Sequence, residues 1–245
     1  MTSQEDVKRF RTNGSWRHLS EKALGYLASA QQRYPVEIQW ALGGGTRLML
    51  EFCHRISDDI DIFVADSAIK GLLSPAFNDA IATDVSGYSD DHSALKLYFK
   101  DLGEIDFIFR PPLLDGANEL YELDRRIVLE PVAEVMAKKL YFRGDRLTPR
   151  DLFDWWYVGS RHSHMIPDLL IAEALRSKLD GIQLALQSLY SQRLDQADSV
   201  WSPMAIWPRI RSPFLPEIGE AVDWANDRLV RFRTLVDPPT IDPSK

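Results

Sequence analysis

Hydrophobic and polar residues alternate between helical and strand-like spacing along the first third of the chain. Apolar side chains recur every three or four positions over residues 15–34, which predicts an amphipathic helix that ends at Pro35. Residues 36–42 alternate apolar and polar positions and then become apolar, as expected for a strand. The pattern next predicts, in order, a glycine turn at 43–45, a helix over 46–55 and a strand over 59–64.

The middle and the end of the chain differ in pattern. The next predicted elements are a helix over 67–82 interrupted at 74–75, an antiparallel hairpin of strands 92–100 and 104–110, and a short strand over 126–130. Beyond Pro131, helical spacing dominates to about residue 190, and the tail rich in proline and tryptophan predicts loops and short helices. We therefore expect an α+β fold, with a mixed β-sheet flanked by helices over 1–131 and a mainly helical region over 132–245.

Composition narrows the class of protein. The chain has 245 residues, of which 45% are hydrophobic and 27% charged, values ordinary for a globular protein. Neither a membrane-spanning run nor the apolar segment of a signal peptide is present. A single cysteine, Cys53, allows no internal disulfide and favours a reducing, cytoplasmic location.

The net charge of −7 is unevenly distributed. Residues 51–106 contain twelve acidic and four basic side chains, whereas residues 138–161 contain six basic and three acidic ones. An acidic region followed by a basic helical one is typical of a site that holds divalent cations together with a polyanion. The alternative is that most of these charges are simply solvated at the surface.

The glycine turn and the residues that follow it predict a phosphate site. Glycine lets backbone N–H groups approach an anion closely, and the start of a helix favours negative charge. Gly44, Gly45 and the hydroxyl of Thr46 are therefore candidates to bind the phosphates of a substrate. Arg47 and Arg55 flank this turn, and guanidinium groups bind phosphate bidentately. Arg55 could instead pair with Asp58 nearby.

Three aspartates predict a metal site. Asp59 and Asp61 are two positions apart on a predicted strand, so both side chains leave the same face. Two carboxylates placed in this way are typical of a cation site, and Asp106, on another predicted strand, would supply a third. Oxygen ligands of this kind indicate Mg²⁺ or Mn²⁺.

The order of these motifs resembles the AbiEii/AbiGii toxin family of minimal nucleotidyltransferases, which are related to the DNA polymerase β superfamily. The first motif of that family resembles Gly44-Gly45-Thr46 followed by the segment 54–61, with Thr46 where the superfamily has serine. The second resembles Lys139-Leu140 followed by the segment 150–154. The resemblance implies a minimal nucleotidyltransferase fold over 1–131, with residues 132–245 completing the nucleotide and acceptor site.

Lys139 and Asp151 each have two interpretations. Lys139 lies on the apolar side of the helix that Pro131 opens, where it either contacts a nucleotide triphosphate, as the resemblance implies, or extends past its neighbours to water. Asp151 stands three residues after Thr148, which is the spacing of a capping box, so it is either a helix cap or a catalytic residue. We expect the two side chains to be partners. The tryptophans of the same helix, Trp155 and Trp156, are predicted to be core residues.

The predicted activity is metal-dependent transfer of a nucleotide from an NTP. The site residues would be Asp59, Asp61, Asp106, Lys139 and Asp151 for catalysis, the three aspartates for the metal, and Gly44, Gly45, Thr46, Arg47, Arg55 and Lys139 for the phosphates. By resemblance, the acceptor is the 3′ end of tRNA or a protein hydroxyl, and the protein is the toxin of a type IV toxin–antitoxin or phage-defence pair with a cognate antitoxin. The alternatives are a small-molecule nucleotidyltransferase of the aminoglycoside-modifying kind and an inactive nucleotide-binding regulator.

Overall fold

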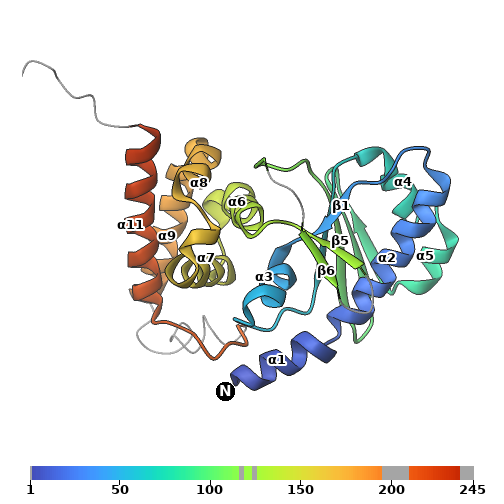
Figure 1. Ribbon diagram of the computed structural model, residues 1–245, viewed down its shortest axis with the longest axis horizontal. Helices are drawn as coiled ribbons and strands as arrows, with labels where there is room; N and C mark the ends of the chain where they lie inside the picture. The colour runs from blue at the N-terminus through green and yellow to red at the C-terminus, as the bar shows by residue number, and fades with distance from the viewer. Residues whose placement is uncertain (1, 116–118, 123–125, 195–209, 238–245) are drawn as a thin grey trace, which may run out of the picture. The chain divides into compact units, whose positions relative to one another are not determined.

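The computed structural model describes residues 2–115, 119–122, 126–194 and 210–237 (Figure 1). Contacts between residues divide the chain into two compact units, Met1–Pro131 and Val132–Lys245. The first unit contains a β-sheet with helices, and the second is built from helices. This architecture is the predicted α+β fold. The catalytic roles assigned to the two parts of the chain stay predictions.

The sheet of the first unit has seven strands within the described residues, in the order β3-β4-β5-β2-β1-β7-β6. The strands are β1 Trp40–Leu42, β2 Ile60–Val64, β3 Gly87–Asp90, β4 Ala94–Phe99, β5 Gly103–Phe109, β6 Glu119–Glu122 and β7 Arg126–Leu129. β2 runs parallel to β5, and β1 runs parallel to β7. The other neighbours are antiparallel, including the predicted hairpin of β4 and β5, so the sheet is mixed.

The two faces of this sheet carry different helices and different side chains. The helices of the unit are α1 Gln4–Asn13, α2 Trp16–Arg33, α3 Gly44–Phe52, α4 Lys70–Leu73 and α5 Asp79–Asp84, with a 3₁₀ turn at Ser67–Ile69. Figure 1 shows α2, α4 and α5 on one face and α3 on the other. Apolar side chains of β2, β4 and β5 are buried in one core cluster with those of α2. Because side chains alternate along a strand, the residues between them, Asp61, Lys96 and Asp106, leave the opposite face.

Several elements of this unit differ from the sequence predictions. Helix α1 and strands β3 and β6 were not predicted, and β1 covers only the last three residues of the predicted strand 36–42. The predicted helix 67–82 is divided because Pro75 follows Ser74, where a proline ring removes a helical hydrogen bond. Helix α3 begins two residues earlier than predicted. It ends at Cys53, which has a left-handed φ of 49°.

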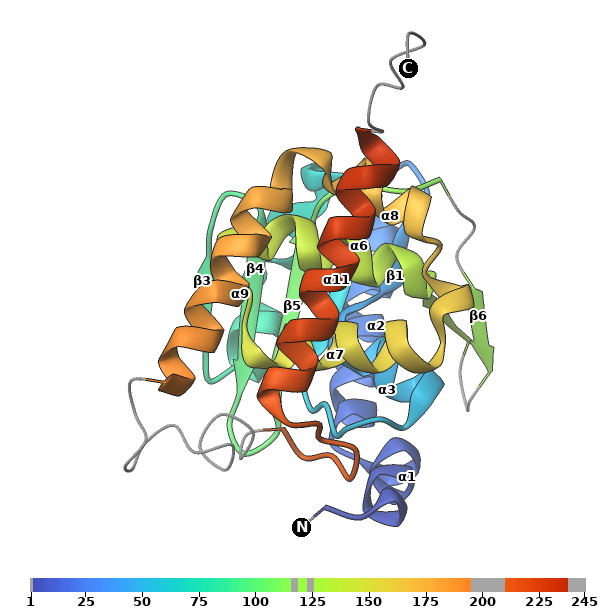
Figure 2. The same cartoon turned by 90° about the vertical axis from the view of Figure 1, so that its left-hand side faces the viewer.

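The second unit consists of the helices α6 Val132–Arg143, α7 Pro149–Arg161, α8 Asp168–Leu175, α9 Leu179–Leu194 and α11 Ile218–Val236, with 3₁₀ turns at Gly144–Arg146, Ser163–Met165 and Arg176–Lys178. Helix α11 contacts α7, α8 and α9, and Figure 2 shows it between α8 and α9. Trp155 is fully buried, and its ring lies 5.5 Å from Trp224 and 6.2 Å from Phe232. Trp156 is also buried, so both tryptophans are core residues, as predicted.

The prediction of only loops and short helices after residue 190 was wrong, because α11 spans 19 residues. Its buried side chains recur every three or four positions, the spacing of an amphipathic helix, and include Ile218, Val222, Leu229 and Val236. The tryptophans and prolines of 195–209 lie outside the described residues. Within the part of the chain that the structure describes, every helix is too short or too polar to cross a membrane.

Candidate active site

The glycine turn before α3 is a place where three protein groups approach the backbone closely. A Cβ on Gly44, which has a φ of +63°, would lie 1.7 Å from Asp61 Oδ2. A Cβ on Gly43 would lie 2.4 Å from Glu130 Oε2, and one on Gly45 would lie 2.5 Å from Arg55 Nη2. Atoms cannot approach so closely, so none of the three positions can accept a side chain without displacing a charged group. The turn therefore seats Asp61 against the start of α3.

Thr46 and Arg47 connect α3 to the neighbouring strands. Both side chains are fully buried. The Thr46 hydroxyl donates to the backbone carbonyl of Asp59 at 2.5 Å. The guanidinium of Arg47 donates to the carbonyl of Glu130 at 2.7 Å and to Glu51 Oε2 at 2.9 Å.

These contacts differ from the predicted phosphate-binding roles. A phosphate would reach Arg47 only after its contacts with Glu130 and Glu51 had broken, and leaving a buried charge without them would be costly. Arg47 thus has a structural role in the first unit, and its predicted contact with a phosphate stays a prediction. The signal missed in the sequence is the carbonyl of Glu130, which is distant along the chain. The phosphate contacts predicted for Gly44, Gly45 and Thr46 stay predictions.

Arg55 lies beside the same turn. Its side chain is buried, its Nη1 donates to the carbonyl of Ile56 at 3.2 Å, and its Nη2 packs against Gly45. The guanidinium is therefore held next to the glycines, close to where the sequence predicted a phosphate.

The strand register brings two of the predicted metal ligands together. β2 and β5 are parallel, and Asp61 is the register partner of Asp106. Their side chains leave the face that does not contain the core cluster. Asp59 precedes β2, and Gly103 at the start of β5 lies near its carboxylate, with a Cβ on that glycine 3.5 Å from Asp59 Oδ1. The three aspartates named from the sequence thus belong to one region of the first unit.

Burial and mutual repulsion change the ionisation of these aspartates. Burial, followed by the negative charge of Asp61, raises the pKa of Asp106 to about 6, although Lys96 opposes this shift. Burial also raises the pKa of Asp59, with further contributions from Glu104, Asp61 and Asp58. A raised carboxyl pKa means that the ionised form is disfavoured, so a cation at this face would be bound favourably.

Lys96 and Glu104 are site residues that the sequence reasoning missed. Lys96 Nζ lies 2.6 Å from Glu104 Oε2 and 3.0 Å from Asp106 Oδ2. Burial lowers the pKa of Lys96, but its bonds to Glu104 and Asp106 outweigh that effect and hold the pKa above its usual range. The signal was present in the predicted hairpin, because the turn at 101–103 pairs Lys96 with Asp106.

The carboxylate face fits a divalent cation with oxygen ligands. Asp106 Oδ1 is buried and has no hydrogen-bond partner among the described residues, while Asp61 Oδ2 lies against Gly44. Within those residues no group of three or more His, Cys, Asp or Glu side chains is gathered as a ready metal site. This arrangement is compatible with Mg²⁺, which typically binds one or two carboxylates and takes its remaining ligands from water and substrate phosphates.

Lys139 and Asp151 form the predicted pair within the second unit. Lys139 Nζ lies 3.1 Å from Asp151 Oδ1 and 3.2 Å from Asp154 Oδ2. Both carboxylates are almost completely buried, and the lysine side chain is 14% exposed. Lys138, the preceding residue of α6, is more deeply buried and lies 3.0 Å from Glu134 Oε1. The ammonium of Lys139 is thus held by two buried carboxylates, and its contact with a nucleotide stays a prediction.

Asp151 is also the helix cap that the sequence allowed. Its backbone N–H donates to the Thr148 hydroxyl at 3.3 Å, and its Oδ2 accepts from the Thr148 backbone N–H at 3.2 Å, which completes a capping box. Burial raises the pKa of Asp151, but Lys139, Thr148 and Arg143 outweigh it, so that the pKa lies below its usual value. The capping role of Asp151 is thus present in the structure, and its catalytic role stays a prediction.

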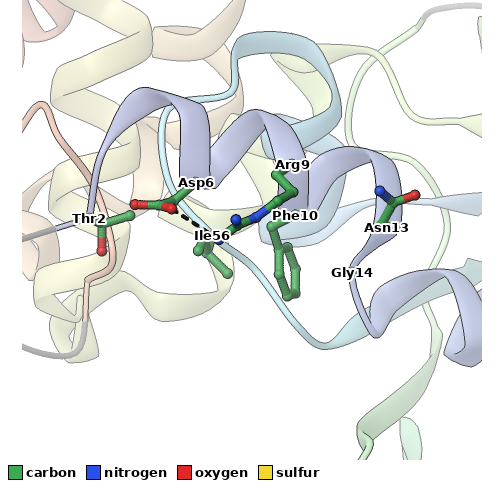
Figure 3. A pocket seen from close by; sticks show the side chains of 7 residues that line it. All are labelled: Thr2, Asp6, Arg9, Phe10, Asn13, Gly14 and Ile56. Carbon is green, nitrogen blue, oxygen red and sulfur yellow. Dashed lines mark hydrogen bonds and ion pairs between the residues drawn. The ribbon is translucent and has the colours of Figure 1, made fainter.

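A separate hollow lies beside α1 in the first unit. It is lined by residues of α1 and its flanks together with Ile56 (Figure 3). Asp6 and Arg9 form an exposed ion pair of 3.2 Å at its edge. None of the residues predicted for catalysis, metal or phosphate lines this hollow, so it is not part of the candidate active site.

Comparison with known proteins identifies the class as nucleotidyltransferases. The family model described as "Nucleotidyl transferase AbiEii toxin, Type IV TA system" matches residues 27–228. The chain therefore belongs to the AbiEii nucleotidyltransferase toxin family. No curated protein matches the chain.

Two solved structures are similar to the chain at low identity. One is the crystal structure of a candidate nucleotidyltransferase from H. pylori, with 17% identity, a TM-score of 0.45, and coverage of 87% of this chain and 93% of that one. The other is a STING-associated CdnE c-di-GMP synthase from Capnocytophaga granulosa, with 12% identity, a TM-score of 0.32, and coverage of 94% and 86% respectively.

Proposed function

We propose that the protein transfers a nucleotidyl group from an NTP to a hydroxyl of a macromolecule, either the 3′ end of a tRNA or a protein side chain, and that the reaction depends on Mg²⁺ or Mn²⁺. The observation that supports this proposal best is the register pairing of Asp61 with Asp106. Among the described residues, the buried Oδ1 of Asp106 has no hydrogen-bond partner. Membership of the AbiEii family supports the nucleotidyl chemistry.

The carboxylates of the first unit would organise the reacting groups. Asp59, Asp61 and Asp106 would hold the cation. When bound, a divalent cation would neutralise the charge of the triphosphate and polarise its α-phosphorus. The bond from the acceptor oxygen to the α-phosphorus forms as the bond to the β-phosphate oxygen breaks, and pyrophosphate leaves. Asp106 would also help to remove the proton of the attacking hydroxyl.

The remaining predicted residues would bind and orient the triphosphate. The N–H groups at Gly44 and Gly45 open α3, where a helix start favours an anion, and the buried guanidinium of Arg55 lies against Gly45. Lys139, which Asp151 and Asp154 hold within the second unit, would contribute positive charge to the phosphates. Catalysis of this kind depends mainly on positioning and electrostatics.

In the cell, we propose that the protein acts as the toxin of a type IV toxin–antitoxin pair with a role in phage defence. Its partner would be a cognate antitoxin, and its location would be the cytoplasm, where NTPs and tRNA are present. Membership of a family of toxins from type IV toxin–antitoxin systems supports this role.

Incubation with α-³²P-labelled NTPs, total RNA and a cell extract, with Mg²⁺ or with a chelator, tests the activity. We expect label on RNA or protein in the presence of Mg²⁺ and a loss of at least about 100-fold for Asp59→Asn, because a charged group that contacts the reacting centre is removed. Asp66→Asn is the matched control, since Asp66 caps a 3₁₀ turn at the far end of β2. If the label appears only on a small hydroxylated molecule, the acceptor is that molecule and not a macromolecule. If the protein binds NTP with Mg²⁺ but transfers no label, it is an inactive regulator.

A further inference from the structure

Lys96 is placed by the sheet itself among the carboxylates of the candidate site. It lies on β4, which is antiparallel to β5, and its register partner is Asp106. Two residues from Asp106 on the same strand, Glu104 points to the same face. The ammonium of Lys96 contacts both, at 2.6 Å from Glu104 Oε2 and 3.0 Å from Asp106 Oδ2. The position is therefore set by backbone pairing and by two ion pairs.

These contacts use oxygen atoms that a second metal ion would need. Two-metal sites hold their ions about 3.5–4 Å apart and share carboxylate oxygens between them. Lys96 takes one oxygen of Asp106 and one of Glu104, and the buried Oδ1 of Asp106 has no hydrogen-bond partner among the described residues. Of the two oxygens of Asp106, Oδ1 thus remains for a divalent ion, and Asp61 is the register partner of Asp106 on the neighbouring strand.

The charges on the carboxylate face also disfavour a second divalent ion. Asp61 and Glu104 each interact electrostatically with both Asp59 and Asp106. Lys96 contacts two of these four carboxylates. A second divalent ion beside the ammonium would be repelled by it, whereas a single ion on the far side of Asp106 would be separated from it by that carboxylate. The lysine and one divalent ion together would balance most of the negative charge.

We infer that Lys96 is a positioning residue that takes the place of a second metal ion, so that the carboxylate face binds one divalent cation and not two. The inference rests on the proposed function, because it concerns the same carboxylates. Lys96 holds Oδ2 of Asp106 and thereby orients Oδ1 towards the cation.

Titration of the full-length protein with Mn²⁺, followed by the electron paramagnetic resonance signal of the unbound ion, counts the bound ions without any need for activity. We expect one Mn²⁺ for the wild type and two for Lys96→Met, in which Glu104 and Asp106 lose their internal cation. Lys22→Met is the matched control, because Lys22 is equally half-buried and pairs with Asp84 at 2.6 Å on another part of the same unit. That control and Lys96→Arg, which restores the charge, should each bind one ion.

Two Mn²⁺ in the wild type, one in a Lys96→Met protein whose circular dichroism matches that of the wild type, or no binding by either protein would overturn the inference. If Lys96→Met does not fold, Lys96→Gln, which also removes the charge, is titrated in its place. Two bound ions would support the inference and one would overturn it. A protein that binds one Mn²⁺ but transfers no nucleotide would refute the proposed function and leave this inference standing. Nucleotide transfer by a wild-type protein that binds two Mn²⁺ would support the proposed function and refute the inference about Lys96.

Discussion

The two units of the protein contain charged clusters that differ in how their charges are balanced. On the sheet of the first unit, Asp59 and Asp106 lie near other carboxylates, and burial together with this repulsion raises the pKa of both. Between α6 and α7 of the second unit, Asp154 and Asp151 both contact Lys139, and the pKa of Asp151 is lowered despite its burial.

The difference indicates different purposes. A cluster whose pKa values are raised stores repulsion that an external cation would relieve, so it is suited to binding and contributes little to folding. A cluster whose charges are satisfied internally favours the folded state, and removing one member leaves a buried charge without its partner. Substitutions in the two clusters should therefore separate activity from stability.

The largest expected effect is on activity, from Asp61→Asn. We expect nucleotidyl transfer to fall by about 10²–10³-fold, because a charged oxygen is lost beside the reacting groups. The free energy of unfolding should stay the same or increase, since Asp61 repels both Asp59 and Asp106. Transfer rates and urea unfolding of the same preparation measure the two effects. A clear loss of stability with retained activity would contradict the comparison.

Asp154→Asn should show the opposite behaviour. Asp154 is fully buried and lies 3.2 Å from Lys139 Nζ, and breaking a buried ion pair typically costs about 3 kcal/mol. We expect the urea midpoint to fall accordingly. Asp227→Asn on the exposed side of α11 is the control and should change stability by less than about 0.5 kcal/mol. An unchanged midpoint for Asp154→Asn would show that the second cluster does not stabilise the fold.

The smallest effect is expected for Thr148→Ala, which removes the hydroxyl of the capping box. The loss should be about 1 kcal/mol at neutral pH, whereas Thr148→Ser, which keeps the hydroxyl, should be close to the wild type.

Thr148→Ala should also change how the stability of the protein depends on pH. The pKa of Asp151 is lowered in the folded protein, so its contribution is complete above the ordinary aspartate pKa and is lost as the pH falls through the folded value. In Thr148→Ala, the pKa of Asp151 should be higher because a hydrogen bond to its carboxylate is missing. The stability that the ionised Asp151 contributes should therefore begin to be lost at a higher pH than in the wild type. Urea midpoints between neutral and acidic pH measure the difference. A constant gap between the two proteins at every pH would rule out the assigned role of Asp151.

Much of the fold was predictable from local patterns. The order of strand, glycine turn, helix and strand around Gly44 follows from residues adjacent in sequence, as do the hairpin of β4 and β5 and the box at Thr148. What the sequence did not reveal depends on partners far away along the chain. The burial of Arg47 depends on the carbonyl of Glu130, and the position of Asp106 beside Asp61 depends on a parallel pairing.

Helix α11 and the pairing of Lys96 with Asp106 were not predicted, although the sequence contains a pattern that indicates each of them. The spacing of apolar residues in α11 was regular, but the prolines before it favoured a prediction of loops. Lys96 was counted only as a charge. Its pairing with Asp106 could have been read from the hairpin register once the turn was assigned, since cross-strand neighbours on one face interact.

The parallel pairing of β2 with β5 has a consequence for the order in which the chain folds. Lys96 and Asp106 meet on one hairpin, whose short connection makes loop closure easy. Asp61 reaches Asp106 only when β2 docks beside β5, a contact between distant parts of the chain that forms slowly. We therefore expect Lys96 to pair with Asp106 before Asp61 reaches them. The charge of Asp106 would then be neutralised early in folding, and the carboxylate face would be completed among the last native contacts of the sheet.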